Sequence, residues 1–274
     1  MYNPPVRDEN NITTGSAGAV PQHPTPDQVL AGPVPQYSTL TIVIPVFNER
    51  ETLLPLLRAV CTQPTPPLHK QIILVDDASS DGTRELLEGD WQHGLPLDPA
   101  DSLTLLLHPE NRGKGACVQN ALTAATGELV LIQDADLEYD PADYPELLKP
   151  VLEGHADAVY GNRFHQGPQR VPRSGRYLLN RFFSLLCDII TGIRLRDVTC
   201  CYKLLRRDLM MALDLRSPRF GMETEMTVKL AATRARIYEV PVRYHGRTYA
   251  EGKKINWSDG VAAVWHLLRY RFFR

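Results

Sequence analysis

Two carboxylates separated by a single residue, Asp134 and Asp136, directly follow an apolar run that ends at Gln133. If a strand continued through them, its two-residue period would point both side chains the same way, and their charges would repel each other. A hard divalent cation relieves such repulsion and keeps coordination positions for the phosphate oxygens of a substrate. Solvated acids, or acids that cap a helix near Pro141, would explain the same residues. The triplet alone leaves both interpretations open.

Polar motifs recur after other apolar runs of the chain. The apolar runs are 40–46, 71–75, 103–107, 129–133 and 156–160, and helix-like segments lie between them at 49–61, 82–89, 114–125 and 142–152. This alternation predicts an α/β fold with a mainly parallel sheet flanked by helices. Ligands bind at the carboxyl ends of the strands in such sheets. The motifs at those ends are 45–49, 76–83, 111–115, 134–136 and 161–163, so we expect one active site.

Two of these motifs contain groups suited to a nucleotide. Asp76 and Asp77 open a turn rich in Ser, Asp and Gly, where one carboxylate can face a ribose hydroxyl or a base N–H. Lys114 lies between Gly113 and Gly115 at an expected helix start. Its charge, open backbone N–H groups and the helix dipole would together form a cradle for phosphate.

Composition excludes some classes of protein. A formal net charge of −2 and a pI near 6.4 give no bulk basic field for nucleic acid. Five scattered cysteines lack the spacing of a zinc site or a disulfide framework, and we interpret them as reduced packing residues of a cytoplasmic protein. The N-terminus has no charged segment followed by an apolar core, and no apolar run is long enough to span a bilayer.

Three regions are expected along the chain. Residues 1–38 are poor in bulky aliphatic side chains and predict a disordered tail. Residues 39–165 would form a nucleotide-binding half and residues 166–274 an acceptor-binding half. The second half offers helices at 177–193, 222–232 and 257–273, a strand at 237–244 and a short piece around 197–205.

Two helices of the second half have an amphipathic pattern. The helix at 177–193 is more apolar than one solvated face requires, although Arg181 and Asp188 interrupt it, so it either packs in the core or lies on a membrane surface. Residues 265–274 mix aromatic side chains with arginines, as segments on anionic membranes do. Packing of this end onto the sheet is the alternative.

In the order in which they occur, the motifs resemble those of the inverting family 2 glycosyltransferases of GT-A (Rossmann-like) fold. The resemblance is strongest to polyprenyl-phosphate hexosyltransferases, the group typified by dolichol-phosphate mannose synthase. It covers the chain from about Leu40 to the C-terminus and is carried by residues 44–49, 75–83, 111–115, 134–139, 161–164, 197–199, 247 and 251–254.

This resemblance implies transfer of a hexose from a nucleoside-diphosphate sugar, GDP-mannose or a UDP-hexose, to a dolichyl or undecaprenyl phosphate. It implies Mg²⁺ or Mn²⁺ as cofactor. Many relatives continue into transmembrane helices near the point where this sequence ends, so we expect peripheral contact with the cytoplasmic face of a membrane or a separate membrane subunit. Neither the base nor the hexose is specified.

The resemblance also assigns roles to individual residues. The nucleotide-sugar site would comprise Pro45, Phe47, Glu49, Asp77, Lys114, Asp134, Lys253 and Lys254. Asp134 and Asp136 would bind the metal, with Glu138 where relatives often have Gln. Asp136, Arg163 and Arg247 would be catalytic, the two arginines contacting the acceptor phosphate and the diphosphate.

A phosphate acceptor is already an anionic nucleophile, whereas a hydroxyl acceptor needs a general base. Glu223 and Glu225 are the base candidates for a family 2 enzyme that glycosylates a saccharide hydroxyl, although acids near a helix start also favour its dipole. A nucleotide-sugar-binding subunit without turnover is the remaining alternative. The two carboxylates and the cations disfavour it.

Overall fold

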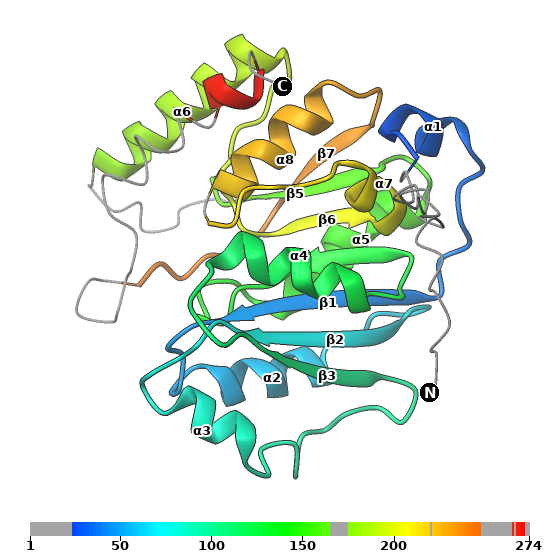
Figure 1. Ribbon diagram of the computed structural model, residues 1–274. Coiled ribbons are helices and arrows are strands. Elements are labelled where there is room, and N and C mark those ends of the chain that lie inside the picture. The colour runs from blue at the N-terminus through cyan, green and yellow to red at the C-terminus, as the bar shows by residue number, and fades with distance from the viewer. Residues whose placement is uncertain (1–23, 165–174, 220, 248–264, 266, 272–274) are drawn as a thin grey trace, which may run out of the picture.

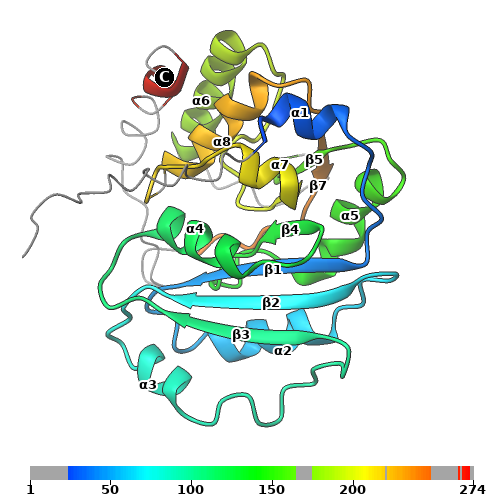
Figure 2. The same ribbon diagram turned by 45° about the vertical axis from the view of Figure 1, so that its right-hand side comes forward.

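The computed structural model describes residues 24–164, 175–219, 221–247, 265 and 267–271. One seven-stranded sheet of order β3-β2-β1-β4-β6-β5-β7 forms its centre (Figures 1 and 2). The strands are β1 (Thr39–Val46), β2 (His69–Asp76), β3 (Ser102–Leu107), β4 (Leu129–Ile132), β5 (Ala158–Asn162), β6 (Lys203–Arg206) and β7 (Ile237–Pro241). All neighbouring pairs are parallel except those of β6, which runs antiparallel to both β4 and β5.

Helices cover both faces of this sheet. They are α1 (Pro26–Ala31), α2 (Leu53–Thr62), α3 (Thr83–Glu88), α4 (Lys114–Ala124), the 3₁₀ turn η1 (Pro141–Asp143), α5 (Tyr144–Leu152), α6 (Gly175–Thr191), α7 (Arg207–Ala212) and α8 (Gly221–Ala231). α4 packs on β1 and β2 and contacts α8, whereas α5 packs on β5 and β7 from the other face, and η1, which precedes α5, contacts α2. Because both faces are covered, β2 and β4 read as continuous apolar runs rather than alternating ones.

The outer layer of the molecule is formed by α6, which packs on α8 (Figure 1). Its buried side includes Phe183, Ser184 and Cys187, while Phe182, Leu185 and Ile189 are exposed. Among the described helices, none combines the length and apolar character needed to cross a bilayer. The expected C-terminal helix at 257–273 lies mostly outside the described residues, and its described part, residues 265 and 267–271, is helical.

The predicted α/β architecture is confirmed, with three local corrections. Disorder was expected up to residue 38, but Pro26–Ala31 form a helix because Thr25 and Gln28 make a reciprocal capping box and Val29 is buried. The short piece around 197–205 contains the strand β6, and α7 follows it directly. β4 ends at Ile132, before the two aspartates, so a continuing strand does not orient them.

Candidate active site

The carboxyl ends of the parallel strands bring the polar motifs to one edge of the sheet, called here the carboxyl edge. The register pairs Val46 with Asp76, and Asp76 with Leu107, so the segments after β1, β2 and β3 leave the sheet together. The chain runs outward from β1 to β3 and then returns to β4 on the other side of β1. Such a reversal of strand order is where open α/β sheets bind ligands. The expected clustering of the motifs is confirmed.

Lys114, the first residue of α4, reaches the first aspartate. Its Nζ lies 2.7 Å from Asp134 Oδ1 and 2.9 Å from Glu223 Oε1, and it donates to Cys201 Sγ at 2.8 Å. Burial alone would raise the pKa of Asp134, but the ammonium of Lys114 outweighs it and holds this pKa below its usual value. Lys114 and Asp134 are therefore both charged.

Arg247 bridges the loops after β1 and β4. Its guanidinium makes two hydrogen bonds to Glu49, of 2.9 and 3.1 Å, and lies 3.2 Å from Asp136 Oδ2. Burial, with the nearby charges of Asp134 and Glu138, raises the pKa of Asp136 to about 6. One arginine does not neutralise this group of acids.

Glu138 is held by the segment that carries Arg247. Its Oε1 accepts the backbone N–H of Arg247 at 2.7 Å and its Oε2 accepts the hydroxyl of Tyr244 at 2.9 Å. Leu137, between the acids, has a positive φ of 60°, which turns the chain sharply after Asp136. A turn, not the strand period that the sequence suggested, therefore brings Asp134 and Glu138 near enough to Asp136 to act on its charge.

The donor set of this region fits a hard divalent cation. We call the three acids after β4 (Asp134, Asp136 and Glu138) the acidic cluster; with Glu49 and Glu223 they make five carboxylates around two cationic side chains, Lys114 and Arg247. Oxygen ligands of this kind suit Mg²⁺ or Mn²⁺. Burial and the neighbouring charges of Asp134 and Glu138 raise the pKa of Asp136 although Arg247 opposes this, so a bound cation would relieve an electrostatic cost at this carboxylate.

The glycines beside Lys114 do not leave an open cradle. Segment 217–219 packs against them: a Cβ on Gly115 would lie 2.1 Å from the carbonyl oxygen of Ser217, and one on Gly113 would lie 2.7 Å from that of Pro218. The N–H of Ala116 already donates to the Pro218 carbonyl. The N–H of Gly113 donates to Asp77, so at least two N–H groups of the expected cradle are already engaged. The glycines instead let the start of α8 approach α4, which brings Glu223 to Lys114.

Asp77 serves as an anchor for the loop after β3. Its carboxylate accepts the N–H groups of Arg112 and Gly113 at 2.9 and 2.7 Å and contacts His108 Nδ1 at 2.8 Å. Cys117 also approaches this imidazole, but burial raises the pKa of its thiol far above the usual value, and a protonated thiol is a poor metal ligand. Asp77, His108 and Cys117 form a hydrogen-bonded core cluster that holds Lys114 in place.

Asp76 differs from its neighbour. Its Oδ2 is held by Arg84, with Nε at 2.6 Å, while its buried Oδ1 has no hydrogen-bond partner among the described residues. Pro45 and Phe47, expected at the nucleoside, are half-buried at the end of β1 next to this turn.

Arg163, just after β5, makes a bidentate ion pair with buried Asp197. Its Nε and Nη2 donate to the carboxylate at 2.7 Å each, and Nη2 also donates to Thr199 at 2.7 Å. The guanidinium lies over the ring of Tyr244 at 5.0 Å, so Arg163 and Glu138 share this tyrosine as a neighbour. Burial would raise the pKa of Asp197, but Arg163 outweighs it and lowers that pKa.

The two base candidates occupy different places. Glu225 is fully buried and accepts the N–H groups of Arg216 and Ser217 while pairing with Lys229. Glu223 faces the site through Lys114. Glu225 thus holds the turn before α8, and only Glu223 is near the acidic cluster.

Sequence reasoning missed several groups of the site. His108 and Tyr244 were not singled out, Cys201 was assigned to packing, and Asp197 was quoted in a motif without a role. Asp197 and Cys201 precede β6, a strand that the pattern did not reveal. Lys253 and Lys254 lie outside the described residues.

The seven-stranded, mostly parallel sheet flanked by helices matches the GT-A fold of glycosyltransferases. Residues 41–213 match the family described as Glycosyl transferase family 2, and the chain belongs to this family. It is a glycosyltransferase.

Relatives agree with this assignment. The undecaprenyl-phosphate mannosyltransferase of Micrococcus luteus is 32% identical over 229 residues, which are 81% of this chain and 90% of that protein. Glycosyltransferase AglJ of Haloferax volcanii is 30% identical, and the match covers 82% of this chain but 65% of the relative. The undecaprenyl-phosphate 4-deoxy-4-formamido-L-arabinose transferase of Serratia proteamaculans is 30% identical, and the match covers 64% of this chain and 51% of that protein.

A solved structure shares the fold. Glucosyl-3-phosphoglycerate synthase from Mycobacterium tuberculosis, in complex with Mn²⁺, UDP and phosphoglyceric acid, superimposes with a TM-score of 0.62 over 86% of this chain and 80% of that one. At 18% identity the likeness shows the fold alone.

Proposed function

We propose that this glycosyltransferase moves a hexose from a nucleoside-diphosphate sugar, GDP-mannose or a UDP-hexose, to a polyprenyl phosphate, with inversion and with Mg²⁺ or Mn²⁺. The observation that carries the proposal is the acidic cluster beside Lys114 and Arg247 at the switch point of the sheet. The matched Micrococcus and Serratia proteins are named for undecaprenyl-phosphate acceptors, which supports the same acceptor class here.

On the donor side, Asp134, Asp136 and Glu138 would hold the cation. A bound Mg²⁺ or Mn²⁺ would neutralise the diphosphate as it leaves. Lys114 and Arg247, which pair with the acidic cluster, are the cations next to that diphosphate. Phe47 and Pro45 would pack on the nucleoside, and Asp77 would act through the loop it anchors at Lys114.

On the acceptor side, a phosphate oxygen would form the new bond to the anomeric carbon as the bond to the nucleoside diphosphate breaks. A phosphate monoester is already anionic, so the chain need only orient and neutralise it. Arg163 is oriented for this task because Asp197 and Tyr244 fix its guanidinium. Lys253 and Lys254, which lie outside the described residues, would add positive charge at the nucleotide-sugar site.

Transfer to a hydroxyl acceptor is the second candidate, favoured by one observation. Glu223 reaches the site, where it could accept a proton. Its ion pair with Lys114 argues against this role, because the paired carboxylate oxygen is already engaged and not free to meet an acceptor hydroxyl.

Membrane attachment belongs to the same proposal, since a polyprenyl phosphate resides in a bilayer. The exposed apolar residues of α6 would provide peripheral contact with its cytoplasmic face, directly or through a separate membrane subunit.

The test is a transfer assay with purified protein, radiolabelled GDP-mannose, UDP-glucose and other UDP-hexoses, Mn²⁺, and undecaprenyl phosphate in detergent. We expect label in the organic phase with one donor, lost on chelation and in Asp136→Asn. Label appearing only on a free saccharide would support the hydroxyl candidate. Donor binding without any transfer would indicate a non-catalytic subunit.

A further inference from the structure

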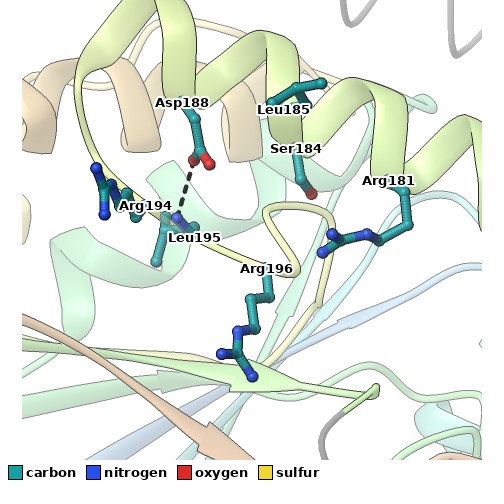
Figure 3. A pocket seen from close by; sticks show the side chains of 7 residues that line it. All are labelled: Arg181, Ser184, Leu185, Asp188, Arg194, Leu195 and Arg196. Atoms are coloured by element: carbon teal, nitrogen blue, oxygen red, sulfur yellow. Dashed lines mark hydrogen bonds between the residues drawn. The ribbon is translucent and has the colours of Figure 1, made fainter.

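A cationic pocket lies between α6 and the loop that leads to Asp197, and its lining contains no residue of the acidic cluster. It has a volume of about 310 Å³ and is lined by Arg181, Ser184, Leu185, Asp188, Arg194, Leu195 and Arg196 (Figure 3). Figure 3 shows Arg181 reaching from the helix and the other two arginines coming from the loop. Three arginines and one aspartate give the lining an excess of positive charge.

Acidic side chains of the described residues do not neutralise the three pocket arginines through ion pairs. The guanidinium groups of Arg181, Arg194 and Arg196 make no ion pair within 4.0 Å to any acid of the described chain. Asp188 accepts the N–H of Leu195 at 3.0 Å, and burial raises its pKa although Arg181 and Arg194 oppose this. Glu239 holds the backbone N–H of Arg196 rather than its side chain. The pocket therefore offers guanidinium donors to an external anion.

The pocket adjoins an exposed apolar surface on the same helix. Phe182, Leu185 and Ile189 are 60%, 56% and 73% exposed, and their spacing of three and four residues places them on one side of α6. Leu185 belongs to both this surface and the pocket lining. Trp265 and Leu268 of the C-terminal segment are also exposed, and Arg271 of that segment donates to the Ile190 carbonyl of α6.

Arginines beside an apolar helix face match the anionic headgroup and the acyl chains of a membrane lipid. Guanidinium groups bind phosphate well, and an apolar helix face can enter the boundary between headgroups and acyl chains. We propose that the Arg181–Arg194–Arg196 pocket binds the headgroup phosphate of an anionic membrane lipid while the exposed face of α6 contacts the acyl layer. This second phosphate site rests on the proposed membrane attachment, and its lining does not include Arg163.

The test compares two double variants of the full-length protein that lose the same charge. The pocket variant is Arg194→Gln with Arg196→Gln, and the control is Arg58→Gln with Lys149→Gln, two exposed residues on α2 and α5 across the sheet. Binding is measured by co-sedimentation with vesicles of phosphatidylcholine, with and without phosphatidylglycerol. Each basic residue near an anionic surface contributes about 1 kcal/mol, so the pocket variant should lose roughly 25-fold in affinity for the anionic vesicles.

The control should change by about twofold or less, and all proteins should bind the neutral vesicles equally. Equal losses in both double variants, or none in the pocket variant, would overturn the proposal. A soluble-phosphate site is distinguished by thermal shift: if inorganic phosphate stabilises the wild type but not the pocket variant, and vesicle affinity is unchanged, the lipid assignment is rejected.

Failure of this proposal is separable from failure of the proposed function. The vesicle assay needs neither donor nor acceptor. Transfer to a short-chain, water-soluble polyprenyl phosphate should be the same in the pocket variant as in the wild type, because the pocket lining contains neither Arg163 nor any residue of the acidic cluster.

Discussion

The carboxyl edge of the sheet and the outer side of α6 differ in whether their cationic side chains form ion pairs. At the edge, Lys114 pairs with Asp134, Arg247 with Glu49 and Asp136, and Arg163 with Asp197. On the outer side of α6, the pocket arginines have no acid partner among the described residues, and large apolar side chains are exposed beside them.

The carboxyl edge is therefore preorganised, whereas the arginines beside α6 would become ordered only on binding an anionic surface. Ion pairs fix the side chains at the edge before any ligand arrives, which reduces the reorganisation that a reaction requires. Exposed arginines keep their rotamer freedom and would gain order only on contact with an anionic surface. Substitutions at the edge should therefore change turnover strongly, and substitutions on α6 should change attachment while leaving stability nearly unaffected.

The largest effect is expected from Asp136→Asn. Transfer should fall by about 100-fold or more, because a cation ligand that contributes several kcal/mol of charge stabilisation is lost. Without metal, at neutral pH, the variant should melt above the wild type, since burial and the neighbouring acids make the ionised Asp136 costly. Turnover against Mn²⁺ concentration and melting in chelator measure both effects.

Asp90→Asn is the matched control for this variant, because its carboxylate is 79% exposed and lies outside the site. It should change neither measurement. Near-normal metal-dependent transfer by Asp136→Asn would remove the metal assignment.

Next in size is the effect of Arg163. Arg163→Ala should lower transfer to polyprenyl phosphate on the order of 100-fold through loss of acceptor alignment, with the KM for the donor unchanged. The single variant also leaves Asp197 as a buried, unpaired charge, which destabilises the fold. Arg163→Ala combined with Asp197→Asn removes that charge, so the double variant should recover stability and stay inactive. If the double variant recovered turnover, Arg163 would have a structural role only and no role in aligning the acceptor.

Much of the edge was predictable from sequence, because strand ends and short motifs are local. Parallel strands whose carboxyl ends meet were evident from alternating apolar runs, and the motifs after β1, β2, β4 and β5 follow from that alternation. The contact between Gly115 and Ser217 was not predictable: these residues are far apart in sequence, and a glycine at a helix start reads equally well as a phosphate cradle.

Other misses have the same origin. β6 is four residues long and antiparallel, so its pairing with β4 and β5 depends on tertiary context and leaves little pattern. Tyr244 and His108 act through partners on distant segments, Glu138 and Asp77. The capped helix Pro26–Ala31 did carry a local signal, Thr25 with Gln28, inside a composition that otherwise indicates disorder.

Glu223 and Glu225 are two residues apart, but their substitution by Gln should affect stability and turnover differently. Glu225→Gln should lower the free energy of unfolding by about 2 to 4 kcal/mol, because a buried acceptor of charge-assisted hydrogen bonds is weakened. Glu223→Gln should change stability little, and transfer to polyprenyl phosphate by less than about tenfold, since an anionic acceptor needs no base. Denaturant unfolding and turnover measure the pair. A loss of about 100-fold or more in Glu223→Gln would favour the hydroxyl-acceptor mechanism.

A smaller effect is expected from pH at the Arg163–Asp197 pair. The pKa of Asp197 is below its ordinary value in the folded protein, so the stabilisation by its charge is present above the ordinary value and lost as pH falls through the lowered one. The difference in unfolding free energy between wild type and Asp197→Asn should therefore be constant from neutral pH down to about 5 and shrink below about 4. Urea unfolding at pH values from 7 to 3 tests this. A difference that grows on acidification would contradict the assigned ion pair.

The smallest effect on stability is expected on the outer side of α6, where two adjacent phenylalanines provide a matched pair. Phe182 is 60% exposed and Phe183 is 5% exposed, so the same substitution removes the same side chain from an exposed and a buried position of one helix. Phe183→Ala should cost about 3 to 5 kcal/mol through the cavity it leaves. Phe182→Ala should stay within about 0.5 kcal/mol of the wild type, as exposed substitutions do.

If α6 enters the acyl layer, Phe182→Ala should nevertheless weaken binding to anionic and neutral vesicles alike by roughly tenfold, because a buried aromatic ring contributes about 1.5 kcal/mol or more. Equal losses on both vesicle types separate this apolar contribution from that of the arginines, which should matter on anionic vesicles alone. A Phe182→Ala protein that binds both as tightly as the wild type would show that the exposed face of α6 does not enter the membrane.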